Sequence, residues 1–207
     1  WGKASKEILS DNDQVGLICE LLVLEKLCEI NPEKALQSWK GPLGEKHDFS
    51  FPIWSLEVKG TCQSARIHTI NGIEQLMPPH KKQLGFISYQ VSRSNDNSPL
   101  SLSNLIDQIN TNYFSSRPDL KLRFQELLLR TGYNPVHARL YRQFRYDIIH
   151  GFLHVVDDTF PKLTPNMFGV ELNSNVSKIR YDISLEGIAG MDLEEVRFGE
   201  FFIEKIA

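Results

Sequence analysis

The sequence predicts an α/β (α+β) fold in which helices flank a mixed central sheet. Two observations indicate this class. Apolar residues recur at helical spacing near the start of the chain, and the pattern then changes to the alternation that is typical of strands. Helix-like and strand-like segments continue to alternate along the 207 residues, as they do in proteins whose helices cover a sheet.

The first predicted helix spans residues 13–30, where leucines recur three or four positions apart. Asp11 or Asp13 is expected to cap its start, because a carboxylate there can accept hydrogen bonds from free backbone N–H groups. A second short helix is expected over 32–37, and the Gly-Pro-Leu-Gly segment 41–44 predicts a turn.

Two short strands follow, HDFSF over 47–51 and IWSLEVKG over 53–60, and Pro52 joins them in a tight turn. Later segments are assigned by the same criteria of period, composition and turn residues. They are a helical turn over 71–76, a strand over 83–93, a loop over 94–99, helices within 101–130 divided near 115–118, a short helical or irregular stretch after Pro135, one strand or a bent pair over 144–156, a strand over 176–185 and a terminal strand or helix over 196–206.

Bulk composition excludes several classes of protein. The formal net charge of −3 argues against a surface coated for nonspecific nucleic-acid binding, although a local basic groove remains compatible with it. No apolar run approaches the roughly 18 residues of a membrane helix, so we expect no membrane partner and a cytoplasmic location. Three cysteines without a CxxC pair predict small buried thiols rather than disulfides or a zinc site.

We expect a single domain over 1–207, because no internal repeat or flexible linker divides the chain. Its core is expected at about 13–93, followed by a helical and β extension over about 100–207 that adds C-terminal strands. The chain begins at Trp1 rather than Met, so it is expected to be a piece of a longer protein.

The candidate chemistry lies between Asp48 and Lys59. If the two short strands pair, the carboxylates of Asp48 and Glu57 approach each other at one end of a sheet. Like charges repel, so such a pair favours a cation between them, and carboxylate oxygens suit Mg²⁺ or Mn²⁺. Lys59 lies on the same strand face as Glu57 and can orient water or offset charge at a phosphoryl group. An alternating surface strand that keeps the protein in solution is the alternative for Glu57 and Lys59.

Several motifs together resemble the PD-(D/E)XK nuclease superfamily. The motifs are GLICEL on the first helix, Trp-Lys-Gly-Pro, HDF, LEVKGT, and the H-x-I-x-x-x-E-Q-L stretch, with FPKLTP and IRYDISL further on. More closely, the chain is similar to the "putative PD-(D/E)XK family member" domains encoded in prokaryotic restriction and defence neighbourhoods. The resemblance extends roughly from Val15 to Leu185 and implies a restriction-endonuclease-like mixed sheet flanked by helices.

The resemblance assigns roles to individual residues. Asp48 matches the first metal-binding aspartate, and Glu57 and Lys59 match the (D/E)XK half. Glu20 matches an auxiliary acid of the metal site, and Gln75 matches a polar residue that lines it. The implied cofactor is Mg²⁺, with Mn²⁺ able to substitute. For Glu20 the alternative is the polar boundary of an amphipathic helix, and for Gln75 it is a cap or a surface amide.

DNA contacts are expected in two places. Arg66 or His68, in the loop after Lys59, can reach a phosphate. The segment 117–145 is richer in arginine and lysine than in acids, with tyrosines interleaved, so it predicts a surface that follows the DNA backbone. The alternative is a solvated helix face with a charge bias. The arginines chosen for that surface are Arg139, Arg142 and Arg145.

These observations favour a Mg²⁺-dependent endonuclease that hydrolyses DNA phosphodiester bonds in restriction or phage defence. The rival hypothesis is a nuclease-like binding or scaffold subunit that has lost cleavage, which the acidic net charge also fits. An RNA-directed nuclease has the same metal chemistry. The family resemblance implies a methyltransferase or helicase of the same defence system as a partner, and a homodimer is a further expectation because cutting both strands needs two sites.

Overall fold

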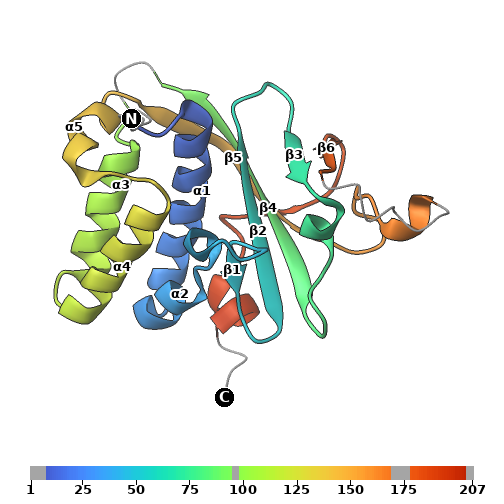
Figure 1. Cartoon of the computed structure of the whole chain (residues 1–207), viewed down its shortest axis with the longest axis horizontal. Coiled ribbons are helices and arrows are strands. Elements are labelled where there is room, and N and C mark those ends of the chain that lie inside the picture. The colour runs from blue at the N-terminus through green and yellow to red at the C-terminus, as the bar shows by residue number, and fades with distance from the viewer. Residues whose placement is uncertain (1–7, 95–97, 169–177, 204–207) are drawn as a thin grey trace, which may run out of the picture.

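A five-stranded mixed sheet organises the chain in the computed structural model, which describes residues 8–94, 98–168 and 178–203 (Figure 1). The strand order is β1-β2-β4-β5-β7, with β2 and β4 parallel and the other neighbours antiparallel. The predicted mixed central sheet is therefore confirmed. The strands are β1 (Phe49–Ser50), β2 (Trp54–Thr61), β4 (Gln83–Arg93), β5 (Tyr146–Val155) and β7 (Met191–Asp192).

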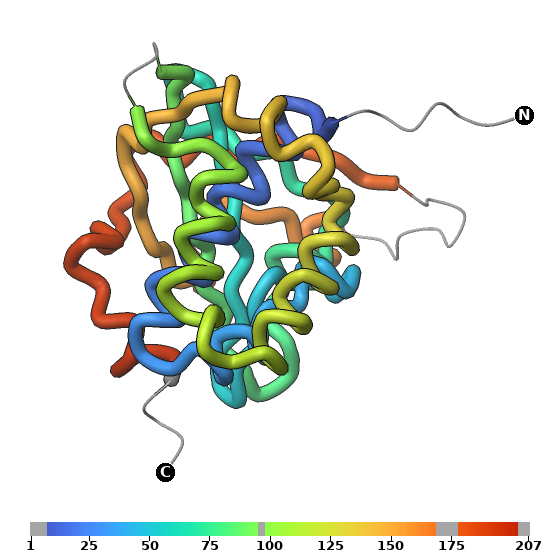
Figure 2. Tube along the Cα trace, turned by 90° about the vertical axis from the view of Figure 1, so that its left-hand side faces the viewer, coloured from blue at the N-terminus to red at the C-terminus, as the bar shows by residue number. Residues whose placement is uncertain are grey.

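Helices cover one face of this sheet in two layers (Figures 1 and 2). The long helix α1 (Asp11–Cys28) contacts β2 on one side and α2 and α3 on the other. None of the helices among the described residues is long and apolar enough to cross a membrane. The remaining helices are α2 (Pro32–Ser38), α3 (Leu102–Ile109), α4 (Pro118–Arg130) and α5 (Ala138–Tyr141), with π-helical turns over Asn110–Phe114 and Gly199–Ile203 and 3-10 turns η1 (Gly41–Leu43), η2 (Ile73–Leu76), Pro135–His137 and Pro165–Phe168.

Strand alternation divides the interior into two hydrophobic cores. Toward α1, Leu56 and Val58 of β2 join the larger core together with Ile87 of β4. On the opposite face, Leu84 and Phe86 of β4 belong to a smaller core. Two antiparallel strands, β3 (Ile67–Asn71) and β6 (Arg180–Ser184), supply residues to this second core. The sheet is therefore buried on both faces.

Several sequence predictions need correction. Ser10, and neither Asp11 nor Asp13, caps α1, since its hydroxyl accepts from the Asp13 N–H. The predicted strand 47–51 shortens to the two residues of β1. Cys62 is exposed, although Cys19 and Cys28 are buried as expected.

Other predictions are confirmed or refined. The segment 144–156 forms one strand, β5, whose register with β4 shifts between Gln90 and Val91 rather than splitting into two strands. Strand β6 begins only at Arg180. The first two residues of its predicted range, the middle of the predicted loop 94–99 and the end of the predicted terminal element lie outside the described residues.

Candidate active site

Asp48 lies at the open edge of β2. Strand β1 pairs only Phe49 with Leu56 and Ser50 with Ser55, so the backbone of Val58 has no strand partner on that side. Asp48, directly before β1, fills the gap: its Oδ2 accepts a hydrogen bond from the Val58 N–H at 2.7 Å. A side-chain acceptor therefore replaces a ladder bond, and this fixes the carboxylate one residue from Glu57.

Glu57 is buried on the face opposite α1, with 1% of its surface exposed. Its Oε1 is shared by two partners, the Lys59 ammonium at 2.7 Å and the side-chain amide of Gln75 at 2.7 Å. Its other oxygen, Oε2, is also buried and has no hydrogen-bond partner. A buried carboxylate oxygen without a partner is costly and uncommon in native structures, and this one leaves an acceptor free for a further ligand.

Glu20 reaches the same edge from α1. The indole N–H of Trp39 donates to Glu20 Oε2 at 2.8 Å, which orients this carboxylate. Gly41 lies between the two acids: a Cβ added there would stand 2.7 Å from Glu20 Oε2 and 3.1 Å from Asp48 Oδ1. A side chain at this position would therefore displace the carboxylate of Glu20 and press against that of Asp48. Sequence reasoning did not identify the roles of Trp39 and Gly41.

An open cavity of about 450 Å³ on the α1 side gives solvent access to Glu20. It is walled by α1, by η1 and by the C-terminal end of α4, and Glu20 and Gly41 line it. On the other side of β2, the Lys59 side chain is 23% exposed. Solvent therefore reaches two members of the cluster, Glu20 from one side and Lys59 from the other.

Burial sets the electrostatics of the cluster. It raises the pKa of Glu57 to about 8, and the charge of Asp48 adds to this effect. Burial, followed by the charge of Asp48, also holds the pKa of Glu20 well above its usual value, and burial raises the pKa of Asp48 despite the Val58 N–H. Burial opposes the charged form of Lys59, but the adjacent Glu57 outweighs it and raises the lysine pKa. Acids that resist ionisation together gain from a cation beside them.

The donor set fits a hard divalent cation. Glu20, Asp48 and Glu57 supply only carboxylate oxygens, which Mg²⁺ and Mn²⁺ prefer, and Glu57 Oε2 is a buried acceptor with no partner. Across the described parts of the chain, no three His, Cys, Asp or Glu side chains already converge as a ligand group. Glu57 Oε1 instead contacts Lys59 and Gln75, so the predicted trio is a set of neighbours rather than a preformed cage.

His68 and Arg66 occupy structural positions. His68 is 2% exposed, its Nε2 lies 2.7 Å from Ser88 Oγ, and burial lowers its pKa to about 4. Ser88 pairs in register with Lys59, so this imidazole packs on the same face of the sheet as the lysine. The Arg66 guanidinium stacks over Phe152 at 4.6 Å and donates to a backbone carbonyl. His68 is buried, so it does not reach the surface where the predicted phosphate contact would lie.

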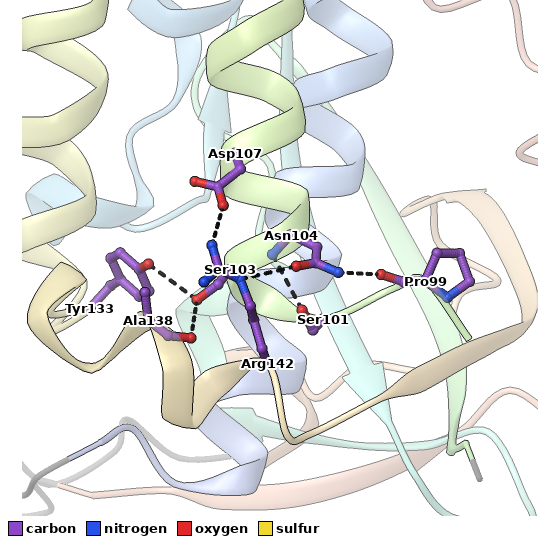
Figure 3. Close-up of polar contacts among 8 residues, drawn as sticks. All are labelled: Pro99, Ser101, Ser103, Asn104, Asp107, Tyr133, Ala138 and Arg142. Atoms are coloured by element: carbon purple, nitrogen blue, oxygen red, sulfur yellow. Dashed lines mark hydrogen bonds and ion pairs between the residues drawn. The ribbon is translucent and has the colours of Figure 1, made fainter. Parts of the chain in front are cut away.

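The arginines predicted to track DNA lie on the helical side of the molecule, around α3 and α5. Figure 3 shows Arg142 bound to Asp107 at 2.6 Å and to Asn104 at 3.3 Å. Arg145 donates to two backbone carbonyls, while Arg139 is exposed. These contacts tie Arg142 and Arg145 to the surface of the fold.

The tyrosines of the same segment belong to the core. Tyr133, Tyr141 and Tyr146 are 5%, 0% and 0% exposed. Tyr133 contacts Ser103 at 3.2 Å, and the Tyr141 hydroxyl accepts from the Leu9 N–H at 3.1 Å. The prediction that these rings stand on a DNA-facing surface is wrong, because all three are buried in the fold.

Comparison with known proteins adds one finding. A protein-family model described as "Putative PD-(D/E)XK family member, (DUF4420)" matches residues 1–186. No curated protein and no solved structure matches the chain. The matched range contains Glu20, Asp48, Glu57, Lys59 and Gln75, and therefore the whole carboxylate cluster at the edge of β2.

Proposed function

We propose, from the premise that the chain belongs to the putative PD-(D/E)XK family, that it is a metal-dependent endonuclease that hydrolyses DNA phosphodiester bonds. One observation carries the proposal. Glu57 is buried, shares Oε1 between Lys59 and Gln75, and keeps Oε2 without a partner beside two more acids. The proposed setting is restriction or phage defence, as the family resemblance implies.

Glu20, Asp48 and Glu57 would hold Mg²⁺, and Mn²⁺ would substitute. The bound cation would supply Lewis acidity toward the phosphate oxygens. The chain itself orients these ligands, since Trp39 donates to Glu20 and the Val58 N–H donates to Asp48. Both contacts hold one carboxylate oxygen while leaving the other available.

Lys59 acts as a cation in this proposal. Its pKa is raised by the adjacent Glu57, so it remains an ammonium at neutral pH and donates rather than accepts protons. An ammonium beside the scissile phosphate offsets the negative charge that develops during attack and orients the attacking water. Gln75 is a positioning residue, because its amide holds Glu57 Oε1.

The scaffold alternative explains this cluster less well. Burying three acids with raised pKa values destabilises a fold, and a binding subunit gains nothing chemical in exchange. Sites with strongly perturbed pKa values are common where chemistry is performed. The buried acids therefore favour the enzyme.

The test is cleavage of supercoiled plasmid with Mg²⁺, with Mn²⁺ and with EDTA, comparing wild type with Lys59→Ala. A matched control is Lys26→Ala, which removes a surface lysine paired with Glu194. Metal-dependent cutting that is lost only in the Lys59 variant supports the nuclease. If the folded wild type neither cuts nor binds Mn²⁺ in calorimetry, or if Asp48→Asn leaves Mn²⁺ binding unchanged, the proposal fails.

A further inference from the structure

The cations of this chain differ in what they contact. Half of the ten arginine side chains among the described residues lie within salt-bridge distance of a carboxylate, which neutralises them locally. Such pairs are Arg93 with Asp11, Arg117 with Glu33 and Asp119, Arg123 with Glu126, Arg142 with Asp107 and Arg197 with Glu200. A paired arginine must exchange its carboxylate before it can bind a phosphate, so it contributes little to DNA affinity.

Two lysines beside the carboxylate cluster contact only neutral acceptors. The Lys46 ammonium donates to the backbone carbonyl of Met77 at 3.2 Å, and the Lys82 ammonium donates to Ser50 Oγ at 2.8 Å. Within the described residues, neither ammonium has a carboxylate within salt-bridge distance. Their full charge is therefore available to an anion.

Lys81 extends this pair on the turn before β4. It is exposed and has a φ of 61°, a conformation that non-glycine residues adopt rarely. The turn is closed by the Lys82 N–H, which donates to the Pro79 carbonyl, and is tied to β2 by the Gln83 N–H, which donates to the Ile53 carbonyl. The turn thus holds two consecutive lysines at the end of the sheet.

We propose that Lys46, Lys81 and Lys82, here named the lysine rim, bind the phosphate backbone of duplex DNA next to the scissile phosphate. The inference rests on the proposed nuclease function for the identity of the ligand. The chemistry it requires is the simplest in nucleic-acid binding, an ammonium beside a phosphate with release of a counterion. It moves the expected DNA contact away from the arginines around α5.

The rim is joined to the active site through Gln75. The side chain of Gln75 donates to Glu57, and its backbone carbonyl lies 3.1 Å from His47 Nε2. His47 is next to Lys46, and Met77, which accepts from Lys46, is two residues after Gln75. The turn η2 and the residue after it therefore position two groups. One is the Gln75 amide that donates to Glu57, and the other is the Met77 carbonyl that accepts from Lys46.

The distance also suits a DNA strand. Trp54 of β2 pairs with Gln83, next to Lys82, and Glu57 is three residues further along the strand. Three residues correspond to about 10 Å at roughly 3.3 Å per residue. The rim therefore lies close enough to the carboxylate cluster for one DNA strand to contact both, with the rim on phosphates that flank the cleaved bond.

The rim and α5 lie at opposite ends of the molecule. In Figure 1, α5 is at the upper left, and the turn that enters β4 is at the lower end of the sheet. The same vertical separation is visible in Figure 2. The lysine rim and the arginines around α5 are therefore alternative contacts for DNA bound at Glu57. Variants of each region can be compared in the same binding experiment.

The experiment measures binding of a 20-base-pair duplex by fluorescence anisotropy in EDTA, between about 50 and 250 mM salt. The rim variant carries Lys46→Gln, Lys81→Gln and Lys82→Gln, and a second variant replaces the same residues by arginine. The matched control carries Arg139→Gln, Arg142→Gln and Arg145→Gln. Each phosphate contact contributes about 0.9 to the slope of log affinity against log salt, so the rim variant should lose roughly 2 to 3 units of slope.

The arginine replacement of the rim should retain the wild-type slope, and the control triple should change it little because these arginines lie around α5, away from the lysine rim. Equal slopes for wild type and the glutamine rim variant would overturn the inference, as would a wild type that binds no duplex. Thermal unfolding of each variant verifies that it is folded. Plasmid cleavage separates the two proposals. If the glutamine rim variant keeps the wild-type salt slope while the wild type cuts DNA with metal, the rim alone is refuted. If the rim variant loses slope but the wild type does not cut, the nuclease alone is refuted.

Discussion

The two faces of β2 bury side chains of opposite character. Toward α1, Leu56 and Val58 pack into the larger hydrophobic core and stabilise the fold. On the other face, Glu57 is buried just as deeply, yet its carboxylate has one unpartnered oxygen and a raised pKa. Burial of an apolar side chain contributes about 1.5–3 kcal/mol, whereas burial of a carboxylate costs several kcal/mol unless it is neutralised. One face thus serves stability and the other keeps a destabilising group in place.

The largest expected effect concerns the charged face. Lys59→Ala should lower the cleavage rate by about 10²- to 10³-fold, because it removes a positioned cation from the site of developing charge. The rate is measured under single-turnover conditions with saturating Mg²⁺. Retained cleavage at the wild-type rate would show that Lys59 only pairs with Glu57.

The next effect contrasts the stability of the two faces. Leu56→Ala should lower the free energy of unfolding by about 2–5 kcal/mol through lost burial and a residual cavity. Glu57→Gln should leave it unchanged or raise it, because the carboxylate is removed and Lys59 can reach solvent. Urea denaturation measures both free energies of unfolding. If Glu57→Gln destabilises the protein as much as Leu56→Ala, the proposed difference between the two faces of β2 is wrong.

A smaller effect is expected at the glycine between the acids. Gly41→Ala places a methyl group against Glu20 Oε2 and Asp48 Oδ1, so Mn²⁺ affinity in calorimetry should fall by roughly tenfold. The control is Gly16→Ala on α1, where an added Cβ meets nothing within 4 Å. That control should keep metal affinity and stabilise the helix by about 0.5–1 kcal/mol. Equal metal affinity in both variants would refute the role assigned to Gly41.

The smallest effect is the pH dependence contributed by His68. Burial and the nearby Lys59 and Arg66 lower its folded-state pKa to about 4, below the unfolded value of about 6.5. The unfolded chain then binds more protons, so this group's contribution is complete above pH 6.5 and is lost as the pH falls toward 4. His68→Gln should therefore lose about 1 kcal/mol less stability than wild type between pH 7.5 and about pH 5.8 in urea titrations. An identical loss in both proteins would contradict the assignment.

Local periodicity predicted the elements that are built from local signals. Helix α1 and strands β2 and β4 follow directly from the spacing of their apolar residues. Strand β3 was not predicted, because it is short and its partner β6 lies more than 100 residues later in the chain. Pairing of that kind depends on tertiary contacts rather than on local sequence.

The candidate site was predictable to a similar extent. Motif order predicted Asp48, Glu57 and Lys59 as site residues, and the family match supports the fold on which they lie. The roles of Trp39 and Gly41 arise from contacts with Glu20 that no local pattern indicates. The lysine rim was missed for the same reason, since its members come from two loops and each resembles an ordinary surface lysine.

The hydrogen bond from Trp39 to Glu20 also places a fluorescent side chain in contact with the carboxylate cluster. The indole is almost fully buried, with 1% of its surface exposed, and its N–H points at a proposed cation ligand. Charge drawn from that carboxylate changes the electric field across the ring and shifts its emission. Occupancy of the site is therefore expected to change the fluorescence of Trp39, measured against the constant background of Trp1 and Trp54.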